Sequence, residues 1–138
     1  IVSDFISGAV EWLSPDNDED HWDIIEGQGS IFHPSFAGVS LGLLHGSQPD
    51  AFVVCHEPIR QNMRGVETPL PTISDVIDQT IKLGTLTNKN IKCIGIALNT
   101  STMTEGIDLL KQKIEDEFKL PCLDPLIDDL APFVNQIK

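Results

Sequence analysis

The sequence has 138 residues, of which 41% are hydrophobic, and a formal net charge of −12. This length suits one domain, and the hydrophobic fraction is that of an ordinary globular protein rather than of a disordered chain. Only nine residues are Lys or Arg, whereas nucleic acids and anionic membranes attract clustered basic side chains. We therefore expect no nucleic-acid and no membrane partner.

The first half of the sequence predicts two helices and two strands in alternation. In chain order these are a helix over residues 2–13, a strand over 22–25, a helix over 35–44 and a strand over 51–55. Apolar residues at helical spacing define the first helix, and Gly46 ends the second. Both predicted strands are short, mainly apolar runs bounded by polar residues, which is typical of strands buried in a sheet.

The second half predicts three further helices and two strands. In chain order these are a helix opened by the capping box Thr72-x-x-Asp75, a strand over 93–98, a helix opened by Thr102-x-x-Glu105 with Met103 facing inward, a strand over 120–123, and a helix opened by Asp124-Pro125 that Pro132 kinks or divides. Apolar strands separated by helices predict an α/β fold, a parallel sheet with helices on both faces. Chain order alone leaves Rossmann, flavodoxin and P-loop NTPase-like variants open.

The phosphate-binding motif G-x-x-x-x-G-K-[ST] does not occur in the sequence. The sequence also begins at Ile1, inside a patterned segment, rather than at Met. We therefore expect residues 1–138 to form a single α/β domain that is the second half of a larger P-loop NTPase-like parent. In that parent, a phosphate-binding strand and helix would precede residue 1.

Ligands of open parallel sheets gather at the carboxyl ends of the strands, and a first polar cluster follows the strand predicted over 22–25. Its members are Glu26, Gly27, Gln28, Gly29, Ser30 and, slightly later, His33. A carboxylate that closes a strand can accept a proton or hold a metal ion, and glycines let the backbone approach a ligand closely. The alternative is a tight turn with a solvated acid.

A second cluster, with His56, Glu57 and Arg60, follows the strand predicted over 51–55. An imidazole, a carboxylate and a guanidinium at a strand end can move a proton or bind an anionic substrate. Arg60 and Arg64 are the only arginines, so an anion site in this chain would use one of them. A salt-bridged loop explains the same residues equally well.

Asn99 follows the strand predicted over 93–98. The donor and the acceptor of its side-chain amide can bind the edge of a base or a pantetheine amide. The same side chain can instead cap the following helix. The sequence does not decide between these two roles.

The three cysteines, Cys55, Cys93 and Cys122, lie within or at the end of apolar segments. Three cysteines cannot all pair within one chain, and no C-x-x-C or zinc-type spacing occurs. Because a reduced thiol packs as a small hydrophobe, we predict that all three are reduced and mostly buried in a cytoplasmic protein.

Five segments of the sequence carry a resemblance to a known family. They are SDFISGAVEWL (3–13), EGQGSIFHPSFAGVSLGLLHGSQPDA (26–51), CHEPIR (55–60), GIALNTS (95–101) and LPCLDP (120–125). They resemble the bacterial D-glutamate N-acetyltransferase family, formerly described as a domain of unknown function, over essentially the whole sequence. More distantly, EGQG and GIALN resemble strand ends of dethiobiotin synthetase, a P-loop carboligase in which an acidic residue assists metal binding.

The resemblance implies a P-loop-type α/β domain and the transfer of an acetyl group from acetyl-CoA to the amine of D-glutamate, an acidic amino acid. On this hypothesis, Glu26 or His56 is the base, and Arg60 and Arg64 hold carboxylates. The remaining residues expected to bind substrate are Gly27, Gln28, Gly29, Ser30, His33, Glu57 and Asn99. We also expect a homo-oligomer, and we expect the 138 residues alone to be inactive.

Two alternatives stay open. One is an ATP-dependent ligase or kinase resembling dethiobiotin synthetase, which would use ATP and Mg²⁺ with Glu26 as a metal ligand. The other is a non-catalytic nucleotide-binding domain with the same fold. A Walker A lysine upstream would favour the ligase or kinase, and its loss would favour the acetyltransferase or the non-catalytic domain.

Overall fold

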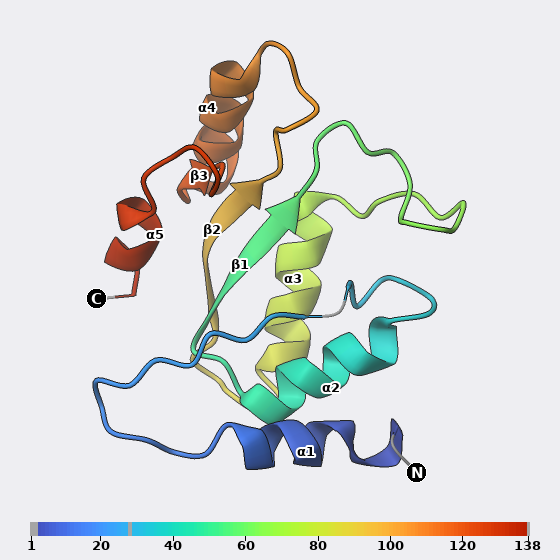
Figure 1. Ribbon diagram of the computed structural model, residues 1–138, viewed down its shortest axis with the longest axis vertical. Coiled ribbons are helices and arrows are strands. Elements are labelled where there is room, and N and C mark those ends of the chain that lie inside the picture. The colour runs from blue at the N-terminus through green and yellow to red at the C-terminus, as the bar shows by residue number, and fades with distance from the viewer. Residues whose placement is uncertain (1–2, 28, 138) are drawn as a thin grey trace. The chain divides into compact units, whose positions relative to one another are not determined.

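The computed structural model describes residues 3–27 and 29–137 (Figure 1). In chain order its elements are the 3-10 turn η1 (Ser3–Phe5), α1 (Ile6–Leu13), α2 (Ala37–Ser47), β1 (Ala51–His56), α3 (Ile73–Gly84), β2 (Lys92–Leu98), α4 (Ile107–Phe118), β3 (Cys122–Leu123) and α5 (Ala131–Asn135). Two compact units are formed, one by the first 50 residues with Asp78–Ile91, and one by Ala51–Ile77 with the residues from Lys92 onwards. Among the described helices, none is both long and apolar enough to cross a membrane.

In the first unit, α1 and α2 pack closely because α2 carries glycine where the two helices meet. A Cβ atom at Gly46 would overlap the backbone carbonyl of Ser7 and lie 2.7 Å from the Cβ of Val10. Only glycine permits this approach. Both helices predicted in this region are confirmed with shifted boundaries, but the prediction that Gly46 ends the second helix is wrong. Gly46 lies inside α2, and Gln48 has the left-handed conformation that follows it.

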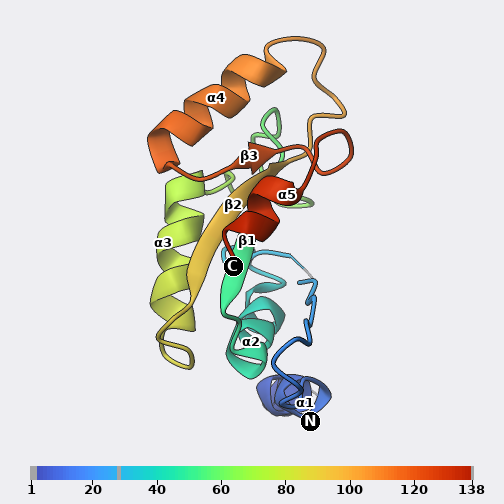
Figure 2. The ribbon, with the colours of Figure 1, turned by 90° about the vertical axis from the view of Figure 1, so that its left-hand side faces the viewer.

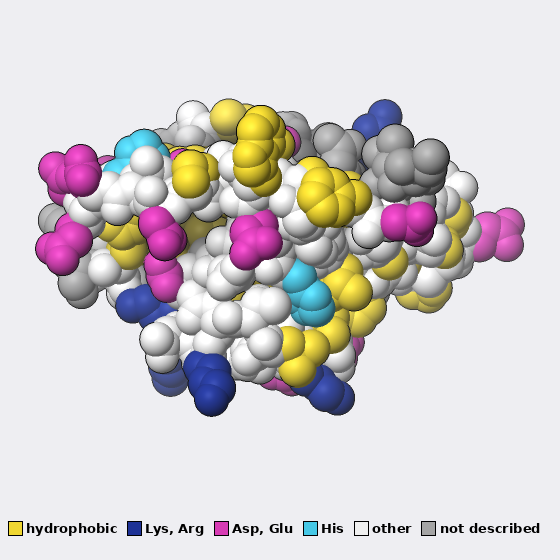
Figure 3. Space-filling model, turned by 90° about the horizontal axis from the view of Figure 1, so that it is seen from below, with side chains coloured by type: hydrophobic (Ala, Val, Ile, Leu, Met, Phe, Trp, Pro, Cys, Tyr) yellow, Lys and Arg dark blue, Asp and Glu magenta, His cyan; other side chains and the backbone are white. Residues whose placement is uncertain are grey.

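The strand predicted over residues 22–25 is wrong, because residues 21–27 have no regular secondary structure. Trp22 is 61% exposed and Ile24 is 92% exposed, and no described strand pairs with either residue. Figure 3 shows hydrophobic side chains exposed among acidic ones on the face that carries α1. A strand forms only where a neighbour satisfies its backbone hydrogen bonds, so an apolar composition was not sufficient here.

The second unit is built on a three-stranded parallel sheet with the order β1-β2-β3. Partly buried residues of α3 and α4 pack against the buried core of this unit, which consists of Val54, Ile96, Leu98, Ile114 and Cys122. On the opposite face, the ring of Phe133 from α5 covers Gly95, where a Cβ atom would overlap it. Figure 2 shows α4 and α5 on opposite sides of β2. The predicted α/β fold, with a parallel sheet and helices on both faces, is confirmed.

The capping box predicted at the start of α3 is confirmed. The Thr72 hydroxyl accepts a hydrogen bond from the Asp75 N–H at 3.1 Å, and the Asp75 carboxylate accepts one from the Thr72 N–H at 3.3 Å. These two bonds satisfy backbone donors that have no partner inside the helix. The local sequence therefore fixes where α3 begins.

Two other predicted helix starts are wrong. The helix predicted to open at Thr102-x-x-Glu105 begins instead at Ile107, and Met103 lies in the preceding loop. The reason is Gly106, whose φ of 74° is left-handed and interrupts a right-handed helix. Asp124-Pro125 opens only a turn, and α5 begins at Ala131 with Pro132 in its first turn. Proline lacks an N–H and is tolerated there, so Pro132 helps to begin the helix rather than dividing it.

Candidate functional site

The carboxyl ends of β1 and β2 lie side by side in the second unit. His56 is opposite Leu98 in the strand register, and the Asn99 N–H donates a hydrogen bond to the His56 carbonyl at 2.9 Å. The carboxyl edge of a parallel sheet is where ligands of such folds bind. The structure therefore brings together two of the predicted site residues, His56 and Asn99, at that edge.

The His56 side chain is half-buried at this edge. Burial lowers the pKa of its imidazole below the ordinary value of 6.5, while the neighbouring carboxylate of Glu57 raises that pKa in part. The ring is therefore mainly neutral at pH 7, and a neutral imidazole can accept a proton. His56 has the protonation state that a general base requires.

Arg60 and Glu57 form an ion pair in the loop that follows β1, and the Arg60 N–H also donates to the Glu57 carbonyl at 3.2 Å. Part of the guanidinium charge is thus balanced within the protein, as expected from the alternative interpretation of these residues as a salt-bridged loop. Arg64 is exposed further along the same loop, which is anchored by the buried side chain of Met63. The loop carries both arginines of the chain, four and eight residues after His56.

Asn99 caps a local turn rather than a helix. Its Oδ1 accepts hydrogen bonds from the N–H of Ser101 at 3.2 Å and from the Ser101 hydroxyl at 2.7 Å, and α4 begins only at Ile107. The helix-capping alternative is therefore wrong. The side-chain Nδ2 has no hydrogen bond to any described residue, and the side chain is exposed, so this donor can reach a ligand carbonyl.

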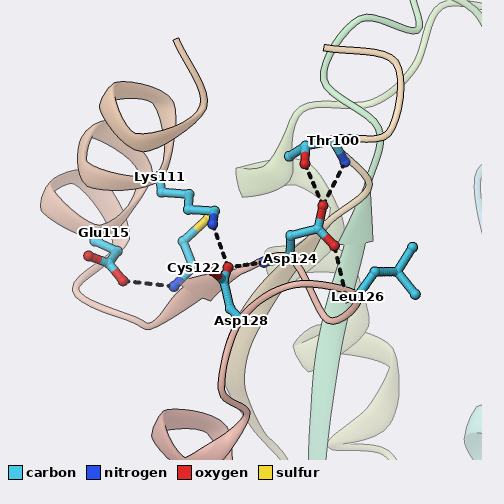
Figure 4. A network of polar contacts seen from close by, with 7 residues as sticks. All are labelled: Thr100, Lys111, Glu115, Cys122, Asp124, Leu126 and Asp128. Atoms are coloured by element: carbon cyan, nitrogen blue, oxygen red, sulfur yellow. Dashed lines mark hydrogen bonds and ion pairs between the residues drawn. The ribbon is translucent and has the colours of Figure 1, made fainter. Parts of the chain in front are cut away.

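The buried carboxylate of Asp124 holds the loop after β2 through hydrogen bonds to Thr100 (Figure 4). Asp124 is 2% exposed. Its oxygens accept hydrogen bonds from the Thr100 N–H at 3.1 Å, from the Thr100 hydroxyl, and from the Leu126 N–H at 2.9 Å. The Thr100 hydroxyl and then the Leu126 N–H lower the pKa of Asp124, against the opposing effect of burial. Asp124 is therefore ionised and fully partnered.

Asp128 connects this carboxylate to α4 (Figure 4). Its Oδ2 accepts a hydrogen bond from the Asp124 N–H at 2.6 Å and forms an ion pair with Lys111. The hydrogen bond from Lys111 is the largest cause that lowers the pKa of Asp128. This network was not predicted from the sequence, because Asp124 in Asp124-Pro125 has the pattern of a helix cap. Its partner Thr100 is 24 residues away in the sequence, and no local pattern signals that pairing.

A shallow hollow of about 410 Å³ lies on the α4 side of the network. Its charged lining consists of one amine, Lys111, and four carboxylates, those of Asp108, Glu115, Asp128 and Asp129. Since Lys111 is already paired with Asp128, the hollow is acidic. It does not suit a substrate that carries carboxylates, whereas the loop that follows β1 carries both arginines.

The first predicted cluster belongs to the first unit. Glu26 and Gly27 are exposed, in a segment without regular secondary structure, and Gln28 lies outside the described residues. The prediction that a strand brings Glu26 to the edge of a sheet is therefore wrong, since residues 22–25 form no strand. Among the described residues, no group of three or more His, Cys, Asp or Glu side chains is placed to hold a metal ion.

The other residues of that cluster shape the turn that leads into α2. The Ser30 hydroxyl accepts a hydrogen bond from the Phe32 N–H at 3.1 Å, beside Gly29 in a bend. His33 is buried, and its Nδ1 accepts a hydrogen bond from the Ser35 N–H at 3.1 Å. Ser30 and His33 thus have structural contacts of their own, and their role toward a ligand stays a prediction.

The prediction of three mostly buried cysteines is wrong for Cys55, which is exposed. The reason is strand alternation: Val54 faces the core, so Cys55 faces the other side of the sheet. Cys93 is partly buried, and Cys122 is buried. Burial, followed by the Glu115 carboxylate, raises the pKa of Cys122 to about 11. Cys122 is therefore an unreactive core residue.

Comparisons with known proteins agree with this architecture. A family described as "Domain of unknown function (DUF1611_C) P-loop domain" matches residues 1–134. A crystal structure of a DUF1611 family protein from Anabaena variabilis superposes with a TM-score of 0.82 at 28% identity, over 95% of this chain and 39% of that chain. Among the variants that the sequence left open, these matches support the P-loop type.

Two curated relatives match nearly the whole chain. A D-glutamate N-acetyltransferase from a Pseudoalteromonas species is 51% identical over 139 residues, which are 99% of this chain and 42% of that protein. A D-glutamate N-acetyltransferase from Tritonibacter scottomollicae is 43% identical over 141 residues, which are 95% of this chain and 42% of that protein. The chain thus spans less than half the length of these relatives.

Proposed function

As the sequence resemblance predicted, this chain belongs to the DUF1611 C-terminal P-loop domain family, and we propose that it is part of a cytoplasmic enzyme that acetylates the amine of an acidic amino acid such as D-glutamate. Two relatives that match at 51% and 43% identity carry the name D-glutamate N-acetyltransferase. Because the chain spans 42% of each, the activity is proposed for the whole protein.

The observation that carries the proposal is the half-buried, mainly neutral His56 at the carboxyl edge of the sheet. The amine of an amino acid is protonated in water and must lose a proton before it can attack a thioester. In the proposed reaction, His56 accepts that proton, and the neutral amine then bonds to the acetyl carbon. The bond from that carbon to the sulfur of CoA breaks, a second proton passes from the nitrogen to the thiolate, and His56 releases the first proton to water.

Substrate binding at the same edge uses the residues around His56. The guanidinium groups of Arg60 and Arg64 bind the carboxylates of the amino acid, since guanidinium groups match carboxylates in charge and geometry. Arg60 does so while it is also paired with Glu57. The Nδ2 of Asn99 donates to an amide carbonyl of the pantetheine arm of acetyl-CoA. Glu57 has a second role, because its carboxylate keeps Arg60 in place.

A separate set of candidate groups belongs to the first unit. Glu26 is the alternative base, and the backbone N–H groups of Gly27, Gln28, Gly29 and Ser30 can stabilise the negative charge that develops on the acetyl oxygen. We assign the base to His56 because its burial keeps it neutral at pH 7. Glu26 is exposed, in a segment without regular secondary structure.

The test is an activity screen of the full-length protein in which acetyl-CoA and ATP·Mg²⁺ are supplied separately, with a panel of D- and L-amino acids. We expect release of free CoA thiol and formation of N-acetyl-D-glutamate with acetyl-CoA alone, followed by thiol titration and mass spectrometry. Amino-acid-dependent turnover only with ATP would contradict the acetyltransferase proposal.

A second candidate is an ATP-dependent ligase or kinase with Glu26 on Mg²⁺. The family's description as a P-loop domain favours it, although these 138 residues contain no phosphate-binding motif of that type. Nucleotide binding without any turnover would favour a third function, a non-catalytic nucleotide-binding domain. The same screen, combined with calorimetry for ATP·Mg²⁺, distinguishes all three.

A further inference from the structure

The carboxylate of Asp124 is matched to three donors. Its two oxygens face the N–H and hydroxyl of Thr100 and the N–H of Leu126, and a carboxylate is the one side-chain group of this size with only acceptors. An asparagine would turn an N–H₂ group toward at least one of these donors. A buried donor without an acceptor is costly, so the site requires an ionised aspartate.

Thr100, the residue that Asp124 holds, lies between two groups at the carboxyl edge. Asn99 precedes it, and Asn99 donates its backbone N–H to the His56 carbonyl at 2.9 Å. Ser101 follows it and donates two hydrogen bonds to the Asn99 side chain. A displacement of Thr100 would therefore move the turn that orients the Asn99 amide.

The support reaches back to α4. Lys111 pairs with Asp128, and Asp128 accepts the Asp124 N–H (Figure 4). The loop between β3 and α5 is thereby attached to α4 on one side and to the loop after β2 on the other. Residues that are fixed at both ends hold a binding group within the narrow range of positions that recognition requires.

We propose that Asp124 is a positioning residue for the proposed acetyl-CoA site: through Thr100 it fixes the turn in which Asn99 presents its Nδ2 donor to the pantetheine arm. This inference rests on the proposed function of the edge near His56. Asp124 touches no substrate and acts only through Thr100. Its loss therefore affects the binding of acetyl-CoA more than the proton transfer at His56.

The test compares Asp124→Asn with Asp129→Asn in the full-length protein. Asp129 is exposed in the same loop and caps the Ala131 N–H at 3.0 Å, a role that asparagine fills as well as aspartate. Asp124→Asn should raise the KM for acetyl-CoA about tenfold, with kcat changed less than threefold and the KM for D-glutamate unchanged. Asp129→Asn should leave all three constants within a factor of two.

A merely structural role gives a different pattern. If Asp124 only stabilises the fold, Asp124→Asn lowers the amount of active enzyme, so that the apparent kcat falls and both KM values stay constant. That result would overturn the inference, as would an Asp124→Asn enzyme with wild-type constants. Thr100 gives a second route if Asp124→Asn does not fold: Thr100→Val should raise the KM for acetyl-CoA, and Thr100→Ser, which keeps the hydroxyl, should restore it. Equal KM values for these two variants would overturn the inference as well.

A measurement that needs no turnover separates this inference from the proposed function. Amide hydrogen exchange of the full-length protein should be at least tenfold faster at Thr100 and Ser101 in Asp124→Asn than in the wild type or Asp129→Asn. If the wild type shows no acetyl transfer, the proposed function fails while faster exchange still supports the positioning of the loop. Unchanged exchange in a folded Asp124→Asn protein would overturn the positioning role whatever the activity.

Discussion

The loop after β2 and the segment before α2 carry similar sequence signals but differ in structure. Each was predicted as a polar cluster that follows an apolar strand, with Asn99 in one and Glu26 in the other. The first is fixed by a paired strand and by the buried Asp124, whereas the second begins within residues 21–27, which have no regular secondary structure. The difference shows that residues after an apolar segment reach the edge of a sheet only where that segment pairs with a neighbouring strand.

Packing differs between the two regions in the same direction. The second unit buries a continuous core around Ile96 and Leu98. In the described part of the first unit, Ile91 is the one large apolar side chain that is buried. Both units also expose such side chains, Trp12, Trp22 and Ile24 in the first and Leu109 and Leu126 in the second. Large exposed apolar groups mark surfaces that bind other protein segments. We expect them to be covered in the full-length protein or in a homo-oligomer, which light scattering and Trp fluorescence quenching of that protein can measure.

The largest effect should come from His56→Gln in the full-length protein. Loss of the base should lower kcat/KM at least a hundredfold, about 2.7 kcal/mol of transition-state stabilisation, with little change in melting temperature. His21→Gln is the matched control, since His21 is exposed in the first unit and its side chain pairs with Asp23. Near-normal turnover of His56→Gln would remove the proposed base.

The pH profile of the wild type sharpens this prediction. Burial keeps the pKa of His56 below its ordinary value of 6.5. The neutral imidazole, which accepts the proton, therefore predominates until the pH falls to that lowered pKa. The acid limb of kcat/KM should therefore lie below pH 6.5 and should be absent from the residual activity of His56→Gln. An acid limb above pH 7 would assign it to another group.

The next largest effect concerns stability. In Gly95→Ala, the new methyl group would overlap the Phe133 ring and lie 3.0 Å from the Pro121 carbonyl, which should cost about 1–3 kcal/mol of unfolding free energy. Gly27→Ala is the control in the other region, because the nearest heavy atom to its Cβ is 4.0 Å away. Denaturant unfolding measures both. Phe133→Leu should recover part of the loss in Gly95→Ala, and equal stabilities of the two alanine variants would contradict the described packing.

A smaller effect is expected from Glu26→Gln. An exposed carboxylate acts on a substrate through water, which screens its charge, so we expect kcat/KM to fall about tenfold. Steady-state kinetics of the full-length enzyme compare it directly with His56→Gln. A loss of a hundredfold or more would restore Glu26 as the base or as a metal ligand. It would also show that the segment before α2 gains, in the whole protein, the neighbours that a strand needs.

The sequence predicted those features of the molecule that depend on neighbours in the chain. Hydrophobic periodicity and the Thr72 capping box predicted the helices, and apolar segments predicted β1, β2 and β3. The alternation of these elements predicted the parallel sheet of an α/β fold. Predictions failed where a distant or backbone factor decides. The apolar segment over 22–25 pairs with none of the described strands. The left-handed conformation of Gly106 makes α4 begin later than predicted, at Ile107.

The candidate site divides in the same way. His56, Glu57, Arg60 and Asn99 were predicted from their position after strands, and the structure places His56 and Asn99 together. The link from Thr100 to Asp124 joins loops that are 24 residues apart. Its residue types are also common at helix caps, so the sequence suggested the cap instead. Only the register of β2 against β3 brings these two loops to the same edge.

The smallest predicted difference between the two regions should appear in acid. The pKa of Asp124 is lowered below 3.8, chiefly by the Thr100 hydroxyl, and that of Asp128 chiefly by Lys111. A carboxyl group whose pKa is lowered by folding stabilises the protein above its unfolded pKa. That stabilisation is lost as the pH falls through the folded value. Exchange protection of the β2 amides, corrected for intrinsic rates, should therefore decrease from about pH 4 downward.

Asp124→Asn should reduce this decrease, because one of the two groups no longer titrates, although the variant is less stable at pH 7. Asp18→Asn, in the exposed acidic loop of the first unit, should leave it unchanged. If Asp124→Asn and Asp18→Asn lose protection along the same curve as the wild type, the buried carboxylate does not hold the loop in its ionised form.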